Sequence, residues 1–192
     1  EAFEDLSDWG ADSVRVGIGG GSICSTRIKT GHGVPTLQSV LDCAQSDRDA
    51  MIIADGGIRT SGDIVKALAA GADLVMLGSL LAGTDESPGE IIDVSEVVNG
   101  SQVCTKYKAY RGMASVEAQI DWRGHTSSVE GVSSKVPYKG PVSDSLNMIE
   151  NGVRSGLSYT GANNIKHFQS KAKFIRQTNA GLQESKTHVH NL

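Results

Sequence analysis

The frame G-A-D-x-V-x-x-G occurs twice in the chain, as GADSVRVG at 10–17 and as GADLVMLG at 71–78. Each copy contains a short β-branched run that ends at glycine, and AMIIADG at 50–56 has the same form. Between these runs, at 36–45 and 61–70, apolar residues recur at helical spacing. Strands that alternate with helices predict βα units on a parallel sheet. The repeat favours a (β/α)₈ barrel over a doubly wound sheet.

The number of strands limits how much of a barrel this chain can form. A (β/α)₈ barrel needs roughly 250 residues. This chain has 192 residues and three convincing strand patterns, at 13–18, 50–56 and 73–78, with a further helical pattern at 143–157. Residues 84–142 show no clear periodicity, and we expect a long functional or disordered loop there. The sequence therefore predicts an α/β fold that amounts to about half a barrel.

The composition excludes several classes of partner. The net charge is −4 and there is no long run of Lys or Arg, so nucleic acid is not expected. No apolar stretch approaches 18 residues, so we expect no membrane span. The three cysteines are irregularly spaced, which argues against a disulfide framework and, with no visible signal peptide, predicts a cytoplasmic protein. Because the chain begins with Glu1 rather than Met, we expect a fragment or a processed chain.

Glycine follows each predicted strand, and serine follows two of the three. The first strand leads into the run GGGSIC at 19–24, the second into Asp55, Gly56 and Gly57, and the third into Gly78 and Ser79. Glycines let backbone N–H groups approach an anion, and serine hydroxyls add donors. A phosphorylated ligand is therefore favoured, with the Asp55 carboxylate as acceptor for a sugar diol. The alternative is that the glycines only form tight turns and that Asp55 only caps a turn.

Cys24 is unusual because it lies on this glycine-rich loop. One interpretation is a small buried hydrophobic residue, which is the role that we expect for Cys43 on the apolar side of a helix. Cys24 differs because its neighbours are Gly, Ser and Thr, with Arg27 and Lys29 close in sequence. Such surroundings can lower the pKa of a thiol and favour the nucleophilic thiolate. We therefore favour a covalent catalytic role for Cys24.

Several segments resemble the IMP dehydrogenase/GMP reductase family. They are VGIGGGSICSTRIKTGHGVP, IIADGGIRTSGDIVKALAAGADLVMLGSLLAGTDESPGE, YRGMAS, VPYKGPVSD and GVRSGLSYTGA. The resemblance implies a (β/α)₈ TIM barrel, usually in a homotetramer. It also implies that residues 1–192 are the C-terminal portion of one catalytic barrel, with about its last three strands and their helices, a flap at 109–140 and a polar tail at 179–192. The N-terminal half of the barrel would then be absent from this chain and would be its partner.

The resemblance also implies chemistry at C2 of a purine nucleotide monophosphate, through a covalent adduct with Cys24. In IMP dehydrogenases, hydride leaves IMP for NAD⁺ and water then releases XMP. In GMP reductases, ammonia leaves GMP and NADPH then delivers hydride to give IMP. Thr26 matches the threonine that handles the water or ammonia, and Glu130 matches an acid near the base or paired with that threonine. The nucleotide-binding positions implied by the match are Ser22, Asp55 (for the ribose diol), Gly56, Gly57, Gly78, Ser79, Tyr110, Gly112, Met113 and Glu130.

The family resemblance further implies a potassium site. In bacterial IMP dehydrogenases the carbonyl groups at the positions of Gly19, Gly21 and Cys24 hold the ion with the tail of a neighbouring subunit. Glu184 and Ser185 are the tail candidates in this chain. The NAD or NADPH site would lie largely in the absent half of the barrel.

Features of both enzymes are present. Only sixteen residues separate Met113 from Glu130, and none forms the Arg-Tyr pair with which the dehydrogenases activate water; Arg123 stands alone there. This short flap and TRIKTG resemble a GMP reductase, whereas GVP, LAGTDESPGE and AGLQESKTH resemble bacterial IMP dehydrogenases. We predict a GMP reductase, with IMP dehydrogenase as the alternative. A different class of alternative is an inactive half-barrel fragment, or a nucleotide-binding subunit of a split enzyme.

Overall fold

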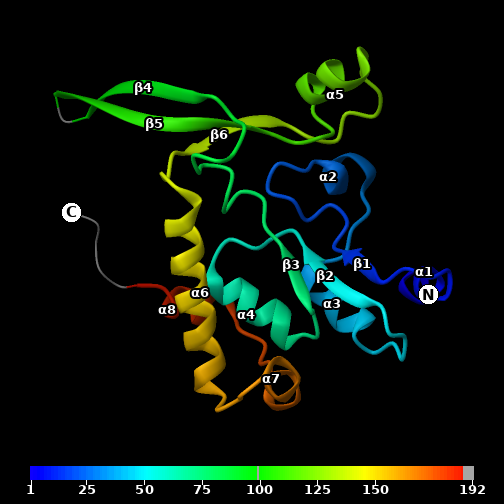
Figure 1. Cartoon of the computed structure of the whole chain (residues 1–192). Helices are drawn as coiled ribbons and strands as arrows, with labels where there is room; N and C mark the ends of the chain where they lie inside the picture. Colours follow the sequence, from blue (N-terminus) through cyan, green and yellow to red (C-terminus); the bar gives the residue numbers. More distant parts are fainter. Residues whose placement is uncertain (99, 188–192) are drawn as a thin grey trace.

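The computed structural model describes residues 1–98 and 100–187, which form two separate three-stranded sheets (Figure 1). The first sheet is parallel, as the sequence pattern predicts, and its strand order is β1-β2-β3. Val14 of β1 lies opposite Ile52 of β2, and Ile53 lies opposite Leu74 of β3. The carboxyl ends of all three strands meet at one edge, where the glycine-rich segments begin. The strands are β1 (Ser13–Val16), β2 (Met51–Asp55) and β3 (Leu74–Met76).

Helices cover one face of the parallel sheet. Val16, Ile52 and Ala54 point to that face and are buried together with Val40 and Phe3 of the covering helices. The opposite face is open, because three apolar side chains of β2 and β3 there are 39–50% exposed. These three are Met51, Leu74 and Met76. The covering helices are α1 (Ala2–Asp8), α3 (Thr36–Cys43) and α4 (Ser61–Ala69).

Two further helices pack outside α4. The two outer helices are α6 (Val142–Tyr159) and α7 (Ile165–Lys171). Phe168 of α7 is 2% exposed and lies in a second apolar cluster with Ile58, Ile64 and Leu68.

The start of α4 is fixed by a capping box, in which the Thr60 hydroxyl accepts the amide of Asp63 while the Asp63 carboxylate accepts the amide of Thr60.

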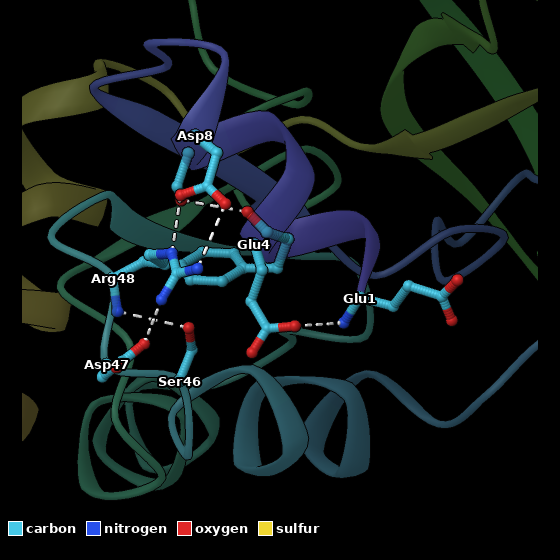
Figure 2. Close-up of polar contacts among 8 residues, drawn as sticks. Glu1, Glu4, Asp8, Ser46, Asp47 and Arg48 are labelled. Atoms are coloured by element: carbon cyan, nitrogen blue, oxygen red, sulfur yellow. Dashed lines mark hydrogen bonds and ion pairs between the residues drawn. The ribbon is translucent and has the colours of Figure 1, made fainter.

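An arginine ties α1 to the loop that precedes β2 (Figure 2). The Arg48 guanidinium donates to both carboxylate oxygens of Asp8, at 2.6 and 3.1 Å, and also pairs with Asp47. This hydrogen bonding lowers the pKa of Asp8 below its ordinary value of 3.8. The contact joins residues 40 positions apart, so it fixes α1 against the sheet without burying a charge.

The second sheet corrects the expectation of a long loop at 84–142. It is antiparallel with order β4-β5-β6, and the β4–β5 hairpin projects to one side of the molecule (Figure 1). Most of its described side chains are exposed on both faces, so no alternating apolar pattern was required. The elements are β4 (Ile91–Val98), β5 (Ser101–Arg111), α5 (Val116–Arg123) and β6 (Ser133–Pro137). The predicted flap, 109–140, thus contains the end of β5, α5 and β6.

Two short helices complete the described chain. α2 (Thr26–Thr30) follows the cysteine loop, and α8 (Asn179–Glu184) lies in the predicted polar tail. The Thr178 hydroxyl caps α8 by accepting the amide of Gly181. The rest of the predicted tail, from 188 to 192, lies outside the described residues. Within the described chain, no helix is both long and apolar enough to cross a membrane.

Candidate active site

Backbone packing positions the glycine-rich loop that follows β1. Gly17 adopts φ +128°, and a Cβ atom there would overlap the carbonyl oxygen of Asp55. Gly56 adopts φ +96°, and its Cβ would lie 2.5 Å from the backbone carbon of Gly20. Only glycine tolerates both the positive φ and the close approach. The loop that carries Cys24 is therefore held directly against the turn that follows β2.

Cys24 begins a chain of side-chain hydrogen bonds. Its thiol donates to Thr26 Oγ1 at 3.1 Å, and the Thr26 hydroxyl donates to Glu130 Oε2 at 2.6 Å. The second distance lies in the short range, about 2.5–2.7 Å, of hydrogen bonds from a hydroxyl to an ionised carboxylate. A thiol, a hydroxyl and a carboxylate in series can pass a proton between the sulfur and a group bound beside it.

Main-chain contacts bring Glu130 to this place. The Ser25 amide donates to the Glu130 carbonyl at 2.7 Å, and the Val132 amide donates to the Ile23 carbonyl at 3.0 Å. Cys24 and Gly131 consequently form an antiparallel bridge. The cysteine loop therefore pairs with a segment more than 100 residues away in sequence, and the flap and Cys24 form one site.

A cavity of about 500 Å³ opens beside Cys24. Small-molecule sites usually have volumes of about 300–1,000 Å³, so a mononucleotide is within range. The predicted site residues that line it come from the cysteine loop, from β2 and from the flap. They are Gly19, Gly21, Cys24, Asp55, Tyr110, Gly112, Met113 and Glu130.

The other predicted residues do not line this cavity; Gly78 lines a neighbouring cavity of about 980 Å³, which shares Tyr110 and Met113 with it. The Ser22 and Tyr110 hydroxyls are 3.5 Å apart, and a Cβ on Gly78 would lie 3.1 Å from the same Tyr110 hydroxyl. Tyr110 therefore joins the ends of β1 and β3. Ser79 directly follows Gly78, while Thr26 reaches the site through Glu130. Gly56 and Gly57 line a separate cavity of about 250 Å³ behind the loop.

Sequence reasoning missed Arg15. This residue lines the cavity, and its Nε lies 3.1 Å from Asp55 Oδ2, so an arginine faces the predicted ribose acceptor. The signal was a charged residue within the β-branched run SVRV, since such a run otherwise indicates a buried strand. Arg111 also lines the cavity, and its guanidinium pairs with Asp121.

The predicted potassium ligands are not brought together within one chain. Gly19, Gly21 and Cys24 share the loop after β1, whereas Glu184 and Ser185 lie at the end of α8, in another part of the molecule (Figure 1). In the loop, the Gly21 carbonyl accepts the Cys24 amide at 3.1 Å. Among the described residues, no hydrogen bond reaches the Gly19 or Cys24 carbonyl, so both oxygens fit the oxygen donor set of a hard cation. The described residues hold no His/Cys/Asp/Glu cluster suited to a metal.

The fold and the site define a class of protein: an α/β protein with a cysteine at the carboxyl edge of a parallel sheet, hydrogen-bonded in series to a hydroxyl and an acid. Comparison with known proteins gives the particular family. The IMP dehydrogenase / GMP reductase domain matches residues 1–188. The chain belongs to the IMP dehydrogenase/GMP reductase family.

Relatives of both kinds are similar to the chain. Inosine-5'-monophosphate dehydrogenase of Nitrosopumilus maritimus is 50% identical, over 98% of this chain and 41% of the relative. GMP reductase of Leishmania major is 46% identical, over 98% of this chain and 39% of the relative. A solved structure of a cysteine-to-alanine variant of Trypanosoma brucei GMP reductase, in complex with guanosine 5'-monophosphate, superposes with a TM-score of 0.88 at 45% identity. That match covers 99% of this chain and 39% of the other.

The chain is much shorter than these relatives. The chain spans about two-fifths of the curated relatives that it matches. Both enzyme names occur among relatives of similar identity, so the comparisons support a purine nucleotide oxidoreductase family and leave the reaction to be argued from the site.

Proposed function

We propose that this chain is the C-terminal portion of a (β/α)₈-barrel GMP reductase, which converts GMP to IMP and ammonia with NADPH. The observation that carries the proposal is the hydrogen-bonded series Cys24, Thr26 and Glu130 beside the cavity. The open face of the parallel sheet supports the partial barrel, because its exposed apolar side chains need a cover. That cover is the N-terminal half of the barrel.

The proposed reaction begins at the sulfur. The Cys24 thiol passes its proton through the Thr26 hydroxyl to the Glu130 carboxylate, and the resulting thiolate forms a bond to C2 of GMP. Glu130 then returns this proton through Thr26 to the 2-amino group. The C2–N bond breaks, ammonia leaves with its electron pair, and a covalent thioimidate remains on Cys24. NADPH, when bound, supplies the hydride that C2 accepts. Cys24 then departs as the thiolate and IMP is released. The thiolate takes up one proton from solvent, which restores the thiol for the next cycle.

The flap favours this reaction over the dehydrogenase reaction. Hydrolysis of a thioimidate needs a base that activates water, and Arg123 is the one arginine between Met113 and Glu130. Its guanidinium stacks on the Trp122 ring, 4.4 Å from the centroid, at the exposed end of α5. It does not line the cavity beside Cys24. The alternative function, oxidation of IMP to XMP with NAD⁺, needs Arg123 to move into that cavity.

The remaining site residues have binding roles in this proposal. Asp55, oriented by Arg15, accepts the ribose diol, and the 5'-phosphate lies among Ser22, Gly78 and Ser79 near the Tyr110 hydroxyl. A potassium ion would be held by the loop carbonyls, with Glu184 and Ser185 of a neighbouring subunit in a homotetramer. The cofactor binds mainly to the other half of the barrel.

One assay tests the proposal: the full-length protein is given GMP with NADPH and, separately, IMP with NAD⁺. Oxidation of NADPH with release of ammonia supports the reductase. Efficient formation of XMP while GMP is inert refutes it and makes Arg123 the first residue to test. The isolated 192-residue chain is expected to be inactive and to be aggregated or associated, since its strand edges and apolar sheet face are uncovered. A sharply melting monomer at low concentration, seen by sedimentation and calorimetry, would contradict the partial barrel.

A further inference from the structure

Lys108 is a buried cation without a carboxylate partner. It lies on β5, between Ile91 of β4 and Val136 of β6, and is 3% exposed. None of the ion pairs in the described part of the chain includes it. A buried ammonium is costly unless each of its three donors is satisfied. The hydrogen bonds that Lys108 donates must therefore offset the cost of burying its ammonium group.

All three acceptors of Lys108 are backbone carbonyls of one segment. Its Nζ donates to Thr84 at 2.8 Å, to Asp85 at 3.2 Å and to Ser87 at 2.5 Å. These residues belong to the irregular segment 79–87, which lies within the connection from β3 to β4 and starts directly after Gly78. Because irregular backbone lacks the regular hydrogen bonds of a helix or strand, the ammonium replaces them and fixes the end of this segment.

A second lysine holds the start of the same segment. Lys139, after β6, donates from Nζ to the carbonyls of Leu80 at 2.9 Å and Ser79 at 3.4 Å. In a trans peptide the C=O and the following N–H point in opposite directions. Holding the Ser79 carbonyl therefore turns the Leu80 N–H away from Lys139.

The adjacent peptide is oriented in the same manner. The Gly78 carbonyl accepts the amides of Leu81 and Ala82, at 3.0 and 3.1 Å, which points the Ser79 N–H the other way. Among the described residues, the N–H groups of Ser79 and Leu80 contact no acceptor. Two oriented, unpaired amides at a strand end are donors suited to an anion.

Tyr110 connects Lys108 to the unpaired amides of Ser79 and Leu80. Residues two apart on a strand share a face, so Tyr110 projects on the same side of β5 as Lys108. Its hydroxyl lies beside Gly78 and 3.5 Å from Ser22 Oγ. By fixing β5 against segment 79–87, Lys108 sets the position of the Tyr110 hydroxyl relative to the free amides.

We propose that Lys108 and Lys139 are positioning residues for the phosphate of the nucleotide. They act on the ligand through the backbone of segment 79–87 and through Tyr110. The inference rests on the proposed function, in which the ligand is a 5'-monophosphate. Their effect falls on the phosphate and spares the base and ribose, which Cys24, Asp55 and Glu130 contact.

The test compares a nucleotide with its nucleoside in the full-length protein. Calorimetric titration with GMP and with guanosine is carried out on wild type, Lys108→Met and Lys139→Met. The matched control is Lys135→Met, which removes a charge from β6; the Lys135 Nζ lies over the Tyr107 ring. We expect GMP affinity to fall about tenfold in Lys108→Met and about threefold in Lys139→Met, while guanosine affinity stays within about twofold. The control should bind both ligands as wild type does.

The steady-state parameters give a second measure. With either lysine variant, KM for the nucleotide should rise while kcat stays within about threefold, since only binding of the unreacting phosphate is affected. If Lys108→Met gives no cooperative melt, Lys139→Met, whose side chain is exposed, decides the question.

Two results overturn the inference. If both lysine variants keep the wild-type ratio of GMP affinity to guanosine affinity, whether or not the affinities fall, the lysines do not position the phosphate. If wild type itself binds guanosine as tightly as GMP, the phosphate site and the proposed function fail together.

Discussion

Replacing Glu130 by glutamine tests whether the Cys24, Thr26 and Glu130 series transfers a proton. The amide oxygen of the introduced glutamine can still accept the Thr26 hydroxyl, which lies 2.6 Å from the present carboxylate, so the flap should stay in place. What is lost is the ability to hold and release a proton. A positioned acid–base group contributes about 10²–10⁴-fold to rate. Each factor of ten equals about 1.36 kcal/mol, so the barrier should rise by about 2.7 kcal/mol or more.

The assay follows NADPH oxidation by the full-length protein with saturating GMP. Glu130→Gln should lower kcat by about 10²-fold or more and leave KM within about threefold. The matched control is Glu117→Gln on α5, because the Glu117 carboxylate also accepts a hydroxyl, that of Ser133, outside the cavity beside Cys24. A Glu130→Gln enzyme with nearly wild-type kcat would refute the proton-transfer role and leave Glu130 as a ligand of the purine ring.

Three further predictions concern Cys24, the turn that follows β2 and the N-terminal helix. Cys24→Ser should abolish turnover while nucleotide affinity stays within about tenfold, or about 1.4 kcal/mol, and wild-type-like activity would remove Cys24 from the mechanism. In denaturant titrations, Gly56→Ala should lower the free energy of unfolding by about 2–4 kcal/mol, because strain at positive φ adds to the overlap with the cysteine loop. Gly57→Ala has the strain at positive φ but open space around it, so it should lower the free energy of unfolding by about 1–2 kcal/mol. Because the pKa of Asp8 is lowered in the folded state, the contribution of Asp8 to stability is present above pH 3.8 and is lost as the pH falls through the folded-state pKa. Asp8→Asn should remove this loss of stability in acid. An NMR titration that shows an ordinary pKa for Asp8 would disprove the contact with Arg48.

The parallel sheet could be predicted because burial on one face demands β-branched runs. The second sheet could not be predicted from periodicity, since its hairpin buries little and needs no apolar alternation. A signal existed nonetheless: five of the eight residues at 91–98 are Ile or Val. Strand propensity alone, without the alternation, would have indicated β4.

The site was predictable only in part for a different reason. Cys24 and Thr26 are two residues apart, and their loop chemistry is visible in the sequence. Glu130 lies 104 residues from Thr26, and only the family resemblance suggested that they meet. Arg15 was overlooked because an ion pair between neighbouring strands depends on register, which local pattern does not reveal.

The ends of the long excursion between β3 and α6 lie side by side. Thr84 and Gly140 form a parallel bridge, and the Asp85 amide donates to the Gly140 carbonyl at 2.9 Å. The chain therefore leaves the part that carries the parallel sheet and returns to it at the same place, so that residues 85–139 form an insertion with adjacent ends. Cys24 belongs to the part of the chain that carries the parallel sheet, and Glu130 belongs to segment 85–139. In such an architecture, insertions, deletions or whole exchanges at 85–139 can change the groups that this segment brings to the cysteine loop, such as Tyr110 and Glu130, without changing how the parallel sheet folds.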